Sequence, residues 1–321
     1  MAPYIIHGSG IAGLLAAKIL AQRGIEFIGL EKSTSLGSPT HADCERLCEL
    51  SCVDFLKRLE PQISWRKIEE LPKERKSGEW EITTETEFPD EEISFLKTPF
   101  FAPSADYVKS LSSQFNDKFL LRKSIIKIAS TSGTVFCQDG TELSYSKILW
   151  CEPLRDLRAC VPTDYSLHLK EPRNNSTGAI QIDLELEKEL ISSRNTFVFP
   201  FRFKDRRLRA LGWNRRQSQV RWWIFLDEIV SGDSEEVAKC IRAFKREVEK
   251  EFPELRKMIR SERIVFHHEI SKKKTTTKKL EIYPSIFYLG PELRIESNGE
   301  SLTELDLIVE NCRIFEGGLP S

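Results

Sequence analysis

The clearest pattern of apolar and polar positions lies in the first 32 residues of the chain. Tyr4-Ile5-Ile6 is a short apolar run that predicts a buried strand. Residues 11–23 carry apolar side chains at 11, 14, 15 and 19, which is helical spacing, and Gly24 ends the pattern. Residues 27–30 are again apolar and predict a second strand. The pattern therefore predicts a strand–helix–strand unit.

The rest of the chain alternates between helical and strand-like spacing. Further helices are expected at 43–59, 105–115 and 233–252 and from Ser301 onward; the third has Asp233 as N-cap and Glu236 three residues on. Residues 118–153 read as strands and turns, with Asp139-Gly140 as a hairpin turn. Other strands are expected at 79–86, 92–97, 177–186, 195–203, 208–214, 219–229, 262–270 and 285–290. The lysine-rich stretch 271–279 is expected to be an exposed loop.

Composition narrows the class of protein. The chain has 321 residues, of which 40 % are hydrophobic and 30 % charged, enough for one large or two modest domains. A net charge of −1 argues against a globally basic nucleic-acid binder. No apolar run reaches the roughly 20 residues of a membrane span. Because the first predicted strand begins at Tyr4, no signal peptide is expected. The eight Cys are therefore expected to be reduced thiols of a cytoplasmic protein.

The turn between the first strand and the first helix carries candidate chemistry. Gly8-Ser9-Gly10-Ile11-Ala12-Gly13 has the G-x-G-x-x-G spacing of a dinucleotide-binding turn. Its glycines suit a tight turn, a backbone close to a pyrophosphate and a helix packed against a strand. The N–H groups at the helix start suit phosphates. The alternative interpretation is an ordinary glycine turn of an α/β fold that binds no nucleotide.

Glu31 ends the second strand, 18 residues after Gly13. A carboxylate there can accept hydrogen bonds from the adenosine ribose, and it disfavours a 2′-phosphate. The first 32 residues therefore predict a site for FAD or NAD rather than NADP, with Lys32 next to the ribose acid.

The order of elements resembles the superfamily of two-domain FAD-dependent oxidoreductases. This group includes amine oxidases, protoporphyrinogen and phytoene oxidases, renalase-like enzymes and UDP-galactopyranose mutases. Three stretches carry the resemblance: Gly8–Lys32, "IIKIASTSGTVFCQDGTELSYSKILWCEP", and "SIFYLGPELR" with the helix that follows it. The segment "NTFVFPFRFKDRRLRALGW" is also similar to aromatic hydroxylases and geranylgeranyl reductases, so the subgroup stays open.

The resemblance implies a fold and a cofactor. It implies an α/β protein with a Rossmann-like FAD-binding domain, a parallel sheet with antiparallel strands added, and a smaller α+β substrate domain with an antiparallel sheet. The FAD-binding domain would comprise residues 1–75, 101–155 and 280–321, and the substrate-facing domain 76–100 and 156–279. FAD would take a hydride from a small organic substrate.

The resemblance also implies cofactor contacts beyond the glycine turn. The strand at Ile125 and Ile126 would pass the adenine, and Cys151, before Pro153, would end a strand near the cofactor. Gly290 and Glu292 would stand at the closing motif of the family, followed by a helix whose N-terminus, at Leu302 and Thr303, faces the flavin. The full set of predicted cofactor-binding residues is Gly8, Ser9, Gly10, Ile11, Ala12, Gly13, Glu31, Lys32, Ile125, Ile126, Cys151, Gly290, Glu292, Leu302 and Thr303. No residue stands out as a catalytic base.

The chain departs from the family pattern at two places. Only Gly37 follows the ribose acid where the family has a glycine pair, and Pro291-Glu292 replaces the closing Asp. These changes support an alternative, a degenerate protein that binds FAD or another nucleotide without redox turnover.

An Arg-rich stretch supports a further alternative. Residues 199–225 contain eight Arg or Lys, one acid and several aromatic side chains. This composition suits a face for an anionic substrate, with Arg202, Arg215 and Trp213 as candidates, and hence a flavin-dependent mutase acting on a nucleotide sugar. A solvated strand face is the more economical interpretation, and single-stranded nucleic acid is the weakest.

Cysteine and histidine groupings suggest no metal site. Cys44, Cys48 and Cys52 share one stripe of a predicted helix, but three ligands along a straight helix diverge, so core packing is expected. His267 and His268 are neighbours in a strand and point to opposite faces, so they are not expected to act together. The expected partner is a small-molecule substrate, with an anion as one option, and the sequence leaves the oligomeric state open.

Overall fold

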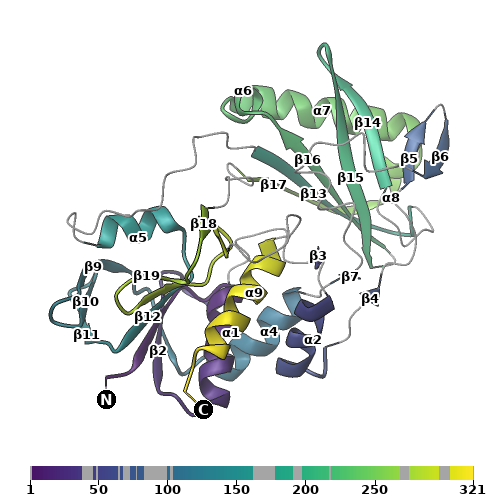
Figure 1. Cartoon of the computed structure of the whole chain (residues 1–321). Helices are drawn as coiled ribbons and strands as arrows, with labels where there is room; N and C mark the ends of the chain where they lie inside the picture. Colours follow the sequence, from purple (N-terminus) through teal and green to yellow (C-terminus); the bar gives the residue numbers. More distant parts are fainter. Residues whose placement is uncertain are drawn as a thin grey trace. The chain divides into compact units, whose positions relative to one another are not determined.

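The computed structural model describes residues 2–37, 46–47, 50–63, 66–67, 73–76, 78–82, 100–101, 104–161, 178–190, 197–216, 218–267, 275–295 and 304–320. The chain divides into two compact units (Figure 1). The first comprises Met1–Arg66, Phe100–Glu171 and Lys274–Ser321, and the second Lys67–Pro99 and Pro172–Lys273. The assignment of a cofactor to the first unit and a substrate to the second stays a prediction.

The first unit is built on a mostly parallel sheet of order β19-β20-β12-β1-β2-β8. Its strands are β1 (Tyr4–His7), β2 (Phe27–Glu31), β8 (Phe119–Leu121), β12 (Lys147–Trp150), β19 (Glu281–Tyr283) and β20 (Ile286–Tyr288). β1 lies between β2 and β12 and is parallel to both, whereas β19 is antiparallel at the edge. The order reverses at β1, so the crevice at the carboxyl ends of β12, β1 and β2 is the expected ligand position.

Both faces of this sheet are covered. Ile6 and Leu149 pack into a core with helices α1 (Ile11–Gln22), α2 (Leu50–Leu59), α4 (Ser104–Phe115) and α9 (Glu304–Gly317). Ile5, Ile148 and Trp150 pack on the other face against α5 (Leu154–Cys160) and the antiparallel sheet of β9 (Ile125–Ala129), β10 (Thr134–Cys137) and β11 (Glu142–Ser144). Burial on both faces explains why the strands read as continuous apolar runs.

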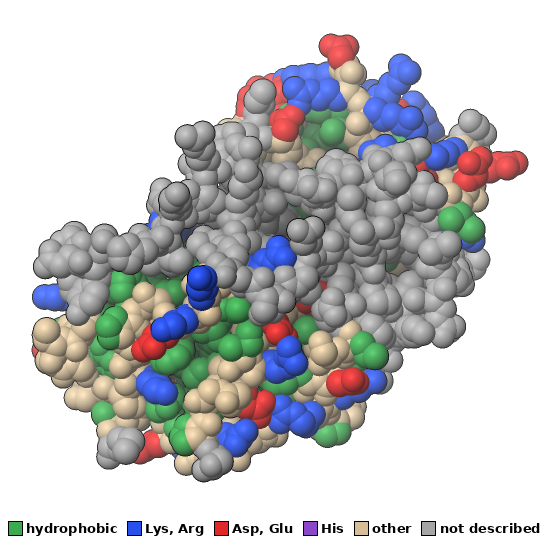
Figure 2. Space-filling model, in the orientation of Figure 1, with side chains coloured by type: hydrophobic (Ala, Val, Ile, Leu, Met, Phe, Trp, Pro, Cys, Tyr) green, Lys and Arg blue, Asp and Glu red, His purple; other side chains and the backbone are tan. Residues whose placement is uncertain are grey.

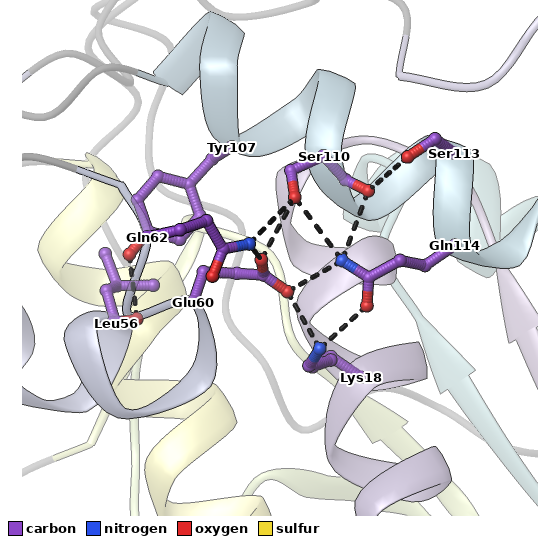
Figure 3. Close-up of polar contacts among 8 residues, drawn as sticks. All are labelled: Lys18, Leu56, Glu60, Gln62, Tyr107, Ser110, Ser113 and Gln114. Atoms are coloured by element: carbon purple, nitrogen blue, oxygen red, sulfur yellow. Dashed lines mark hydrogen bonds and ion pairs between the residues drawn. The ribbon is translucent and has the colours of Figure 1, made fainter.

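A buried carboxylate fixes α1 against its neighbours (Figure 3). Glu60, only 1 % exposed, follows α2. It accepts hydrogen bonds from Gln114 at 2.9 Å, Ser110 at 3.0 Å and Gln62, and pairs with Lys18 of α1 at 2.9 Å. Ser110 and Gln114 belong to α4, so this Glu60 cluster joins three helices and holds the helix that begins at the glycine turn.

The second unit is a seven-stranded sheet with helices on one face. The sheet order is β17-β13-β16-β15-β14-β5-β6, antiparallel except where β14 meets β5. The strands are β5 (Lys73–Lys76), β6 (Glu79–Ile82), β13 (Gly178–Leu186), β14 (Phe197–Phe203), β15 (Arg206–Arg216), β16 (Gln219–Leu226) and β17 (Ile259–His267). Helices α7 (Ser234–Glu251) and α8 (Leu255–Met258) pack against one face, and α6 (Glu228–Ser231) precedes α7.

Most of the predicted elements are confirmed. Asp233 caps α7 by accepting hydrogen bonds from the N–H groups of Glu235 and Glu236, and Gly140, with φ of +84°, lies in the turn between β10 and β11. Several predictions lie partly or wholly outside the described residues, among them the strand at 92–97, the ends of the strands at 79–86 and 262–270, and the start of the final helix.

Two predictions are wrong in part. The helix predicted at 43–59 is present as α2 over 50–59, but its first part contains the short strand β3 (Arg46–Leu47). This strand pairs with β7 (Phe100–Phe101), which lies beside β4 (Arg66–Lys67). The predicted loop at 271–279 contains β18 (Thr275–Thr277), which pairs with β21 (Leu293–Ile295). In both cases pairing with a distant strand decides the local structure. No helix in the described part of the chain is both long and apolar enough to cross a membrane.

Candidate functional site

The glycine turn, residues 8–13, has the backbone that its sequence predicts. Gly8 has a φ of +99°, a conformation that side chains other than glycine's rarely adopt. A β-carbon on Gly13 would lie 1.9 Å from the carbonyl oxygen of Gly8, so only glycine lets the helix approach the turn this closely. These two glycines are therefore required by the fold itself.

The start of α1 offers free hydrogen-bond donors. Leu14 donates its N–H to the Gly10 carbonyl at 3.0 Å. Within the described part of the chain, the N–H groups of Ile11, Ala12 and Gly13 have no acceptor. Unpaired N–H groups at the positive end of a helix dipole bind anions such as phosphates. The turn and helix start therefore fit the pyrophosphate of an adenine dinucleotide.

Glu31 is held by the turn and the loop beside it. Its Oε2 accepts hydrogen bonds from the Ser9 N–H at 2.8 Å and the Ser9 hydroxyl at 2.5 Å, and its Oε1 accepts from the Ser33 N–H at 2.7 Å. Burial acts to raise the pKa of Glu31, but the hydrogen bonds from Ser9 and Ser33 outweigh it, so the pKa is lowered. Glu31 is therefore a charged residue that fastens the glycine turn to the segment after β2.

A second carboxylate, Glu152, lies beside the turn. It follows β12, and its Oε2 accepts a hydrogen bond from Lys32 Nζ at 2.5 Å. A β-carbon on Gly8 would come within 2.9 Å of Glu152 Oε1. Burial raises the pKa of Glu152 despite the pairing with Lys32, and the neighbouring charge of Glu31 adds to the rise. Sequence reasoning missed Glu152; its position after a predicted strand of the parallel sheet was the available signal.

His7 ends β1 and is held neutral. The ring is 3 % exposed and packs 4.2 Å from the Trp150 ring, measured between centroids. Its Nε2 accepts a hydrogen bond from the Ile125 N–H at 3.2 Å, so the proton of the neutral ring belongs on Nδ1. Among described residues Nδ1 has no partner. Burial, followed by the charge of Lys32, lowers the pKa of His7 to about 3.

The residues that the resemblance places near the adenine are brought to the same end of the sheet. Ile125 is buried, and its carbonyl accepts a hydrogen bond from the Cys160 thiol at 3.1 Å, while its N–H is taken by His7. Ile126 is 54 % exposed on the opposite face of β9. Cys151 follows β12 directly, and burial raises the pKa of its thiol. The backbone of Ile125 is thus already paired within the protein.

The predicted closing motif has structural partners of its own. The Gly290 carbonyl accepts a hydrogen bond from the Asn311 side chain of α9 at 2.9 Å. Glu292 Oε2 accepts a hydrogen bond from the Leu154 N–H at 3.3 Å, at the start of α5. Leu302 and Thr303 lie outside the described residues.

The predicted substrate residues in the second unit do not converge on one point. Arg202 lies opposite Arg207, and Trp213 opposite Arg221, on the same face of the sheet. Trp213 lies six positions after Arg207 on β15, which is roughly 20 Å along a strand. Lys and Arg side chains gather around the end of the β14–β15 hairpin (Figure 2). The side chain of Arg215 lies outside the described residues.

A polar chain crosses that face near Trp213. Arg221 forms a two-point ion pair with Asp183, at 2.5 and 3.0 Å. Asp183 accepts a hydrogen bond from Gln181 at 2.6 Å, and Gln181 Oε1 lies 3.2 Å from His267 Nε2. Arg221, the cation opposite Trp213, is therefore already paired with Asp183.

The cysteine prediction is confirmed for the one member of its set that is described. Cys52 is 1 % exposed within the apolar core of the first unit, whereas Cys44, Cys48 and also His268 lie outside the described residues. In the segments that the structure covers, no group of three or more His, Cys, Asp or Glu is placed to hold a metal ion.

Comparisons with known proteins find similarity in structure alone. No protein-family model and no curated protein sequence matches the chain. An oxidoreductase from Methanosarcina mazei superposes with a TM-score of 0.69 at 10 % identity, covering 98 % of this chain and 100 % of that one. A geranylgeranyl bacteriochlorophyll reductase-like protein from Thermoplasma acidophilum has a TM-score of 0.66 at 12 % identity, with 98 % and 78 % covered.

A third similar structure is PqsL from Pseudomonas aeruginosa, described as a probable FAD-dependent monooxygenase. It has a TM-score of 0.59 at 10 % identity, with 98 % of this chain and 85 % of PqsL covered. At these identities the similarity establishes the fold. The predicted fold class, a parallel-sheet Rossmann-like domain with a smaller domain on an antiparallel sheet, is confirmed. None of the three is described as an amine oxidase, so that subgroup stays a prediction.

Proposed function

We propose that this chain is an FAD-dependent oxidoreductase that acts on a small organic substrate. The observation that carries the proposal is the glycine turn at the strand-order reversal of a parallel sheet, with the free N–H groups of Ile11, Ala12 and Gly13. The fold shared with an oxidoreductase, a reductase-like protein and a probable FAD-dependent monooxygenase supports it. These relatives favour the hydroxylase and reductase grouping over the amine-oxidase one.

Different residues of the first unit would bind different parts of the cofactor. The N–H groups of α1 would hold the pyrophosphate, and Ile125 and Cys151 would flank the adenosine half. Gly290 and the start of the final helix would hold the flavin half, where the helix dipole stabilises negative charge. When bound, FAD supplies a hydride acceptor, and the protein supplies orientation and a site shielded from water.

The experiment that tests this proposal is the spectrum of the purified protein. We expect flavin absorbance, directly or after incubation with FAD, and release of FAD on denaturation. Anaerobic mixing with nicotinamide and organic electron donors should then bleach the flavin band and sustain turnover. A folded protein that stays colourless after incubation with FAD would rule the proposal out.

A degenerate protein that binds a nucleotide without turnover is the second candidate. Two observations favour it: Glu292 serves as a cap for α5, and both Glu31 oxygens are engaged by the protein. Bound flavin that no donor reduces would support this candidate, whereas sustained turnover would exclude it. The mutase alternative has less support, because Arg202 and Trp213 are roughly 20 Å apart along the sheet.

A further inference from the structure

We propose that Glu152, positioned by Lys32, is the carboxylate that recognises the ribose of the bound adenine nucleotide. Sequence spacing assigns that role to Glu31. The inference rests on the proposed function, because it requires a nucleotide at the glycine turn.

The acceptor sites of Glu31 are largely used by the protein itself. A carboxylate has about four lone-pair sites, two on each oxygen. Both sites of Glu31 Oε2 are taken by the N–H and hydroxyl of Ser9, and Oε1 accepts from the N–H of Ser33. The residue is only 3 % exposed. A ribose hydroxyl would have to displace one of these bonds, which also hold the glycine turn in shape.

Glu152 offers what Glu31 lacks. Its Oε2 pairs with Lys32, but Oε1 makes no hydrogen bond within the described part of the chain. That oxygen lies beside the α-carbon of Gly8, since a β-carbon there would come within 2.9 Å of it. The side chain is 14 % exposed, so it is reachable by a ligand and still well ordered by its surroundings. Glu152 therefore presents an unused charged acceptor at the turn.

Lys32 fixes the direction of that acceptor. It follows β2, whereas Glu152 follows β12, so their ion pair joins the strands on either side of β1 at the carboxyl edge of the sheet. The pair leaves Oε1 free while cancelling a negative charge that would otherwise repel a pyrophosphate. Lys32 is thus engaged internally by Glu152.

A buried donor next to the turn also lacks a partner. His7 precedes Gly8, and its Nδ1 is buried without an acceptor among the described residues. Buried polar groups in native proteins are nearly always hydrogen-bonded, so an unpaired one calls for an explanation. Glu152 thus has an unused acceptor and His7 an unused donor, and the two residues lie at the ends of adjacent parallel strands. This arrangement is expected of a site in which a polar ligand supplies the missing hydrogen-bond partners.

The test compares two matched variants, Glu152→Gln and Glu31→Gln, by calorimetric titration with ADP, 2′-deoxy-ADP and 3′-deoxy-ADP. The quantity compared is the ratio of the dissociation constant of a deoxy ligand to that of ADP. In the wild type, removing the recognised hydroxyl should weaken binding about 10- to 100-fold, the usual range for a hydrogen bond to a charged group. Glu152→Gln should reduce this ratio to about 2- to 10-fold, because the bond becomes neutral. Glu152→Met, which has no acceptor, should bring the ratio to about one.

Glu31→Gln should lower thermal stability but keep the wild-type ratio. The inference is overturned if the ratio survives in both Glu152 variants, if it collapses in Glu31→Gln, or if the wild type binds all three ligands equally. Those outcomes leave the nucleotide site standing. Failure of the folded wild type to bind ADP at all would instead remove the site, and the proposed function with it.

Discussion

His7 should make the protein sensitive to mild acid, and His7→Gln should remove that sensitivity. Burial, followed by the nearby charge of Lys32, lowers the pKa of His7 from 6.5 to about 3 in the folded chain. Between these two values the unfolded chain binds a proton that the folded chain does not, so acid favours unfolding. Gln does not titrate, and its amide oxygen can still accept the hydrogen bond from the Ile125 N–H.

The size of the effect follows from the two pKa values. For an unfolded pKa of 6.5, lowering the pH from about 7 to about 5 should cost about 2 kcal/mol of unfolding free energy at this residue alone. Glu31 and Glu60 have lowered pKa values, so their stabilisation is present above the ordinary value of 4.5 and is lost only in stronger acid. Glu152, whose pKa is raised, works in the opposite direction in both proteins, so the difference between them isolates His7.

The assay is urea unfolding followed by circular dichroism at half-unit steps across this pH range. The wild-type curve should fall relative to that of His7→Gln by about 2 kcal/mol as the pH drops. Parallel curves would refute the reasoning, because they would mean that His7 titrates normally in the folded chain or that its environment is open to water.

Two further predictions concern the helix that carries the turn. Gly13→Ala places a β-carbon 1.9 Å from the Gly8 carbonyl oxygen, which should lower the unfolding free energy by about 1–3 kcal/mol and abolish dinucleotide binding. The control is Gly317→Ala, whose β-carbon would have no described atom within 4 Å. This control should change neither the chemical denaturation curve nor the binding. Glu60→Gln should lower the unfolding free energy by about 1–3 kcal/mol at neutral pH by removing the ion pair with Lys18. Since the folded pKa of Glu60 is lowered, the gap from the wild type should narrow in acid; an equal gap at all pH values would contradict the assigned charge.

Local patterns were sufficient to predict the elements that depend on local chemistry. The strand, glycine turn and α1 follow from apolar spacing and from Gly8 and Gly13, whose backbone demands are visible in the sequence. Asp233 likewise predicts the start of α7, because an N-cap side chain accepts hydrogen bonds from N–H groups only two or three residues further along the chain. The alternation in β13 to β16 predicts an antiparallel sheet, since each strand buries side chains against α7 on one face.

Features that depend on pairing between residues far apart in the chain could not be predicted from the sequence. β3 and β18 are held by strands far along the chain, and their two- or three-residue length leaves no periodic signal. The pairing of Lys32 with Glu152 joins residues 120 positions apart. It becomes visible only once the sheet order places the ends of β2 and β12 on either side of β1.

The predicted site shows the same division. The spacing placed Glu31 correctly at the end of β2, but it could not show that Ser9 and Ser33 use its oxygens. In the closing motif, Glu292 was a candidate cofactor ligand, and the structure adds its hydrogen bond to the start of α5. Contacts of Glu31 and Glu292 with a cofactor stay predictions.

The most direct test of the central claim is an equilibrium titration of the purified protein with FAD, followed by flavin fluorescence, alongside Gly13→Ala. The glycine turn predicts saturable binding at one site per chain in the wild type and loss of that binding in the variant. ADP should compete with FAD, because both would use the N–H groups of Ile11, Ala12 and Gly13. A folded wild-type protein with no saturable response, or a Gly13→Ala variant that binds FAD equally well, would contradict it.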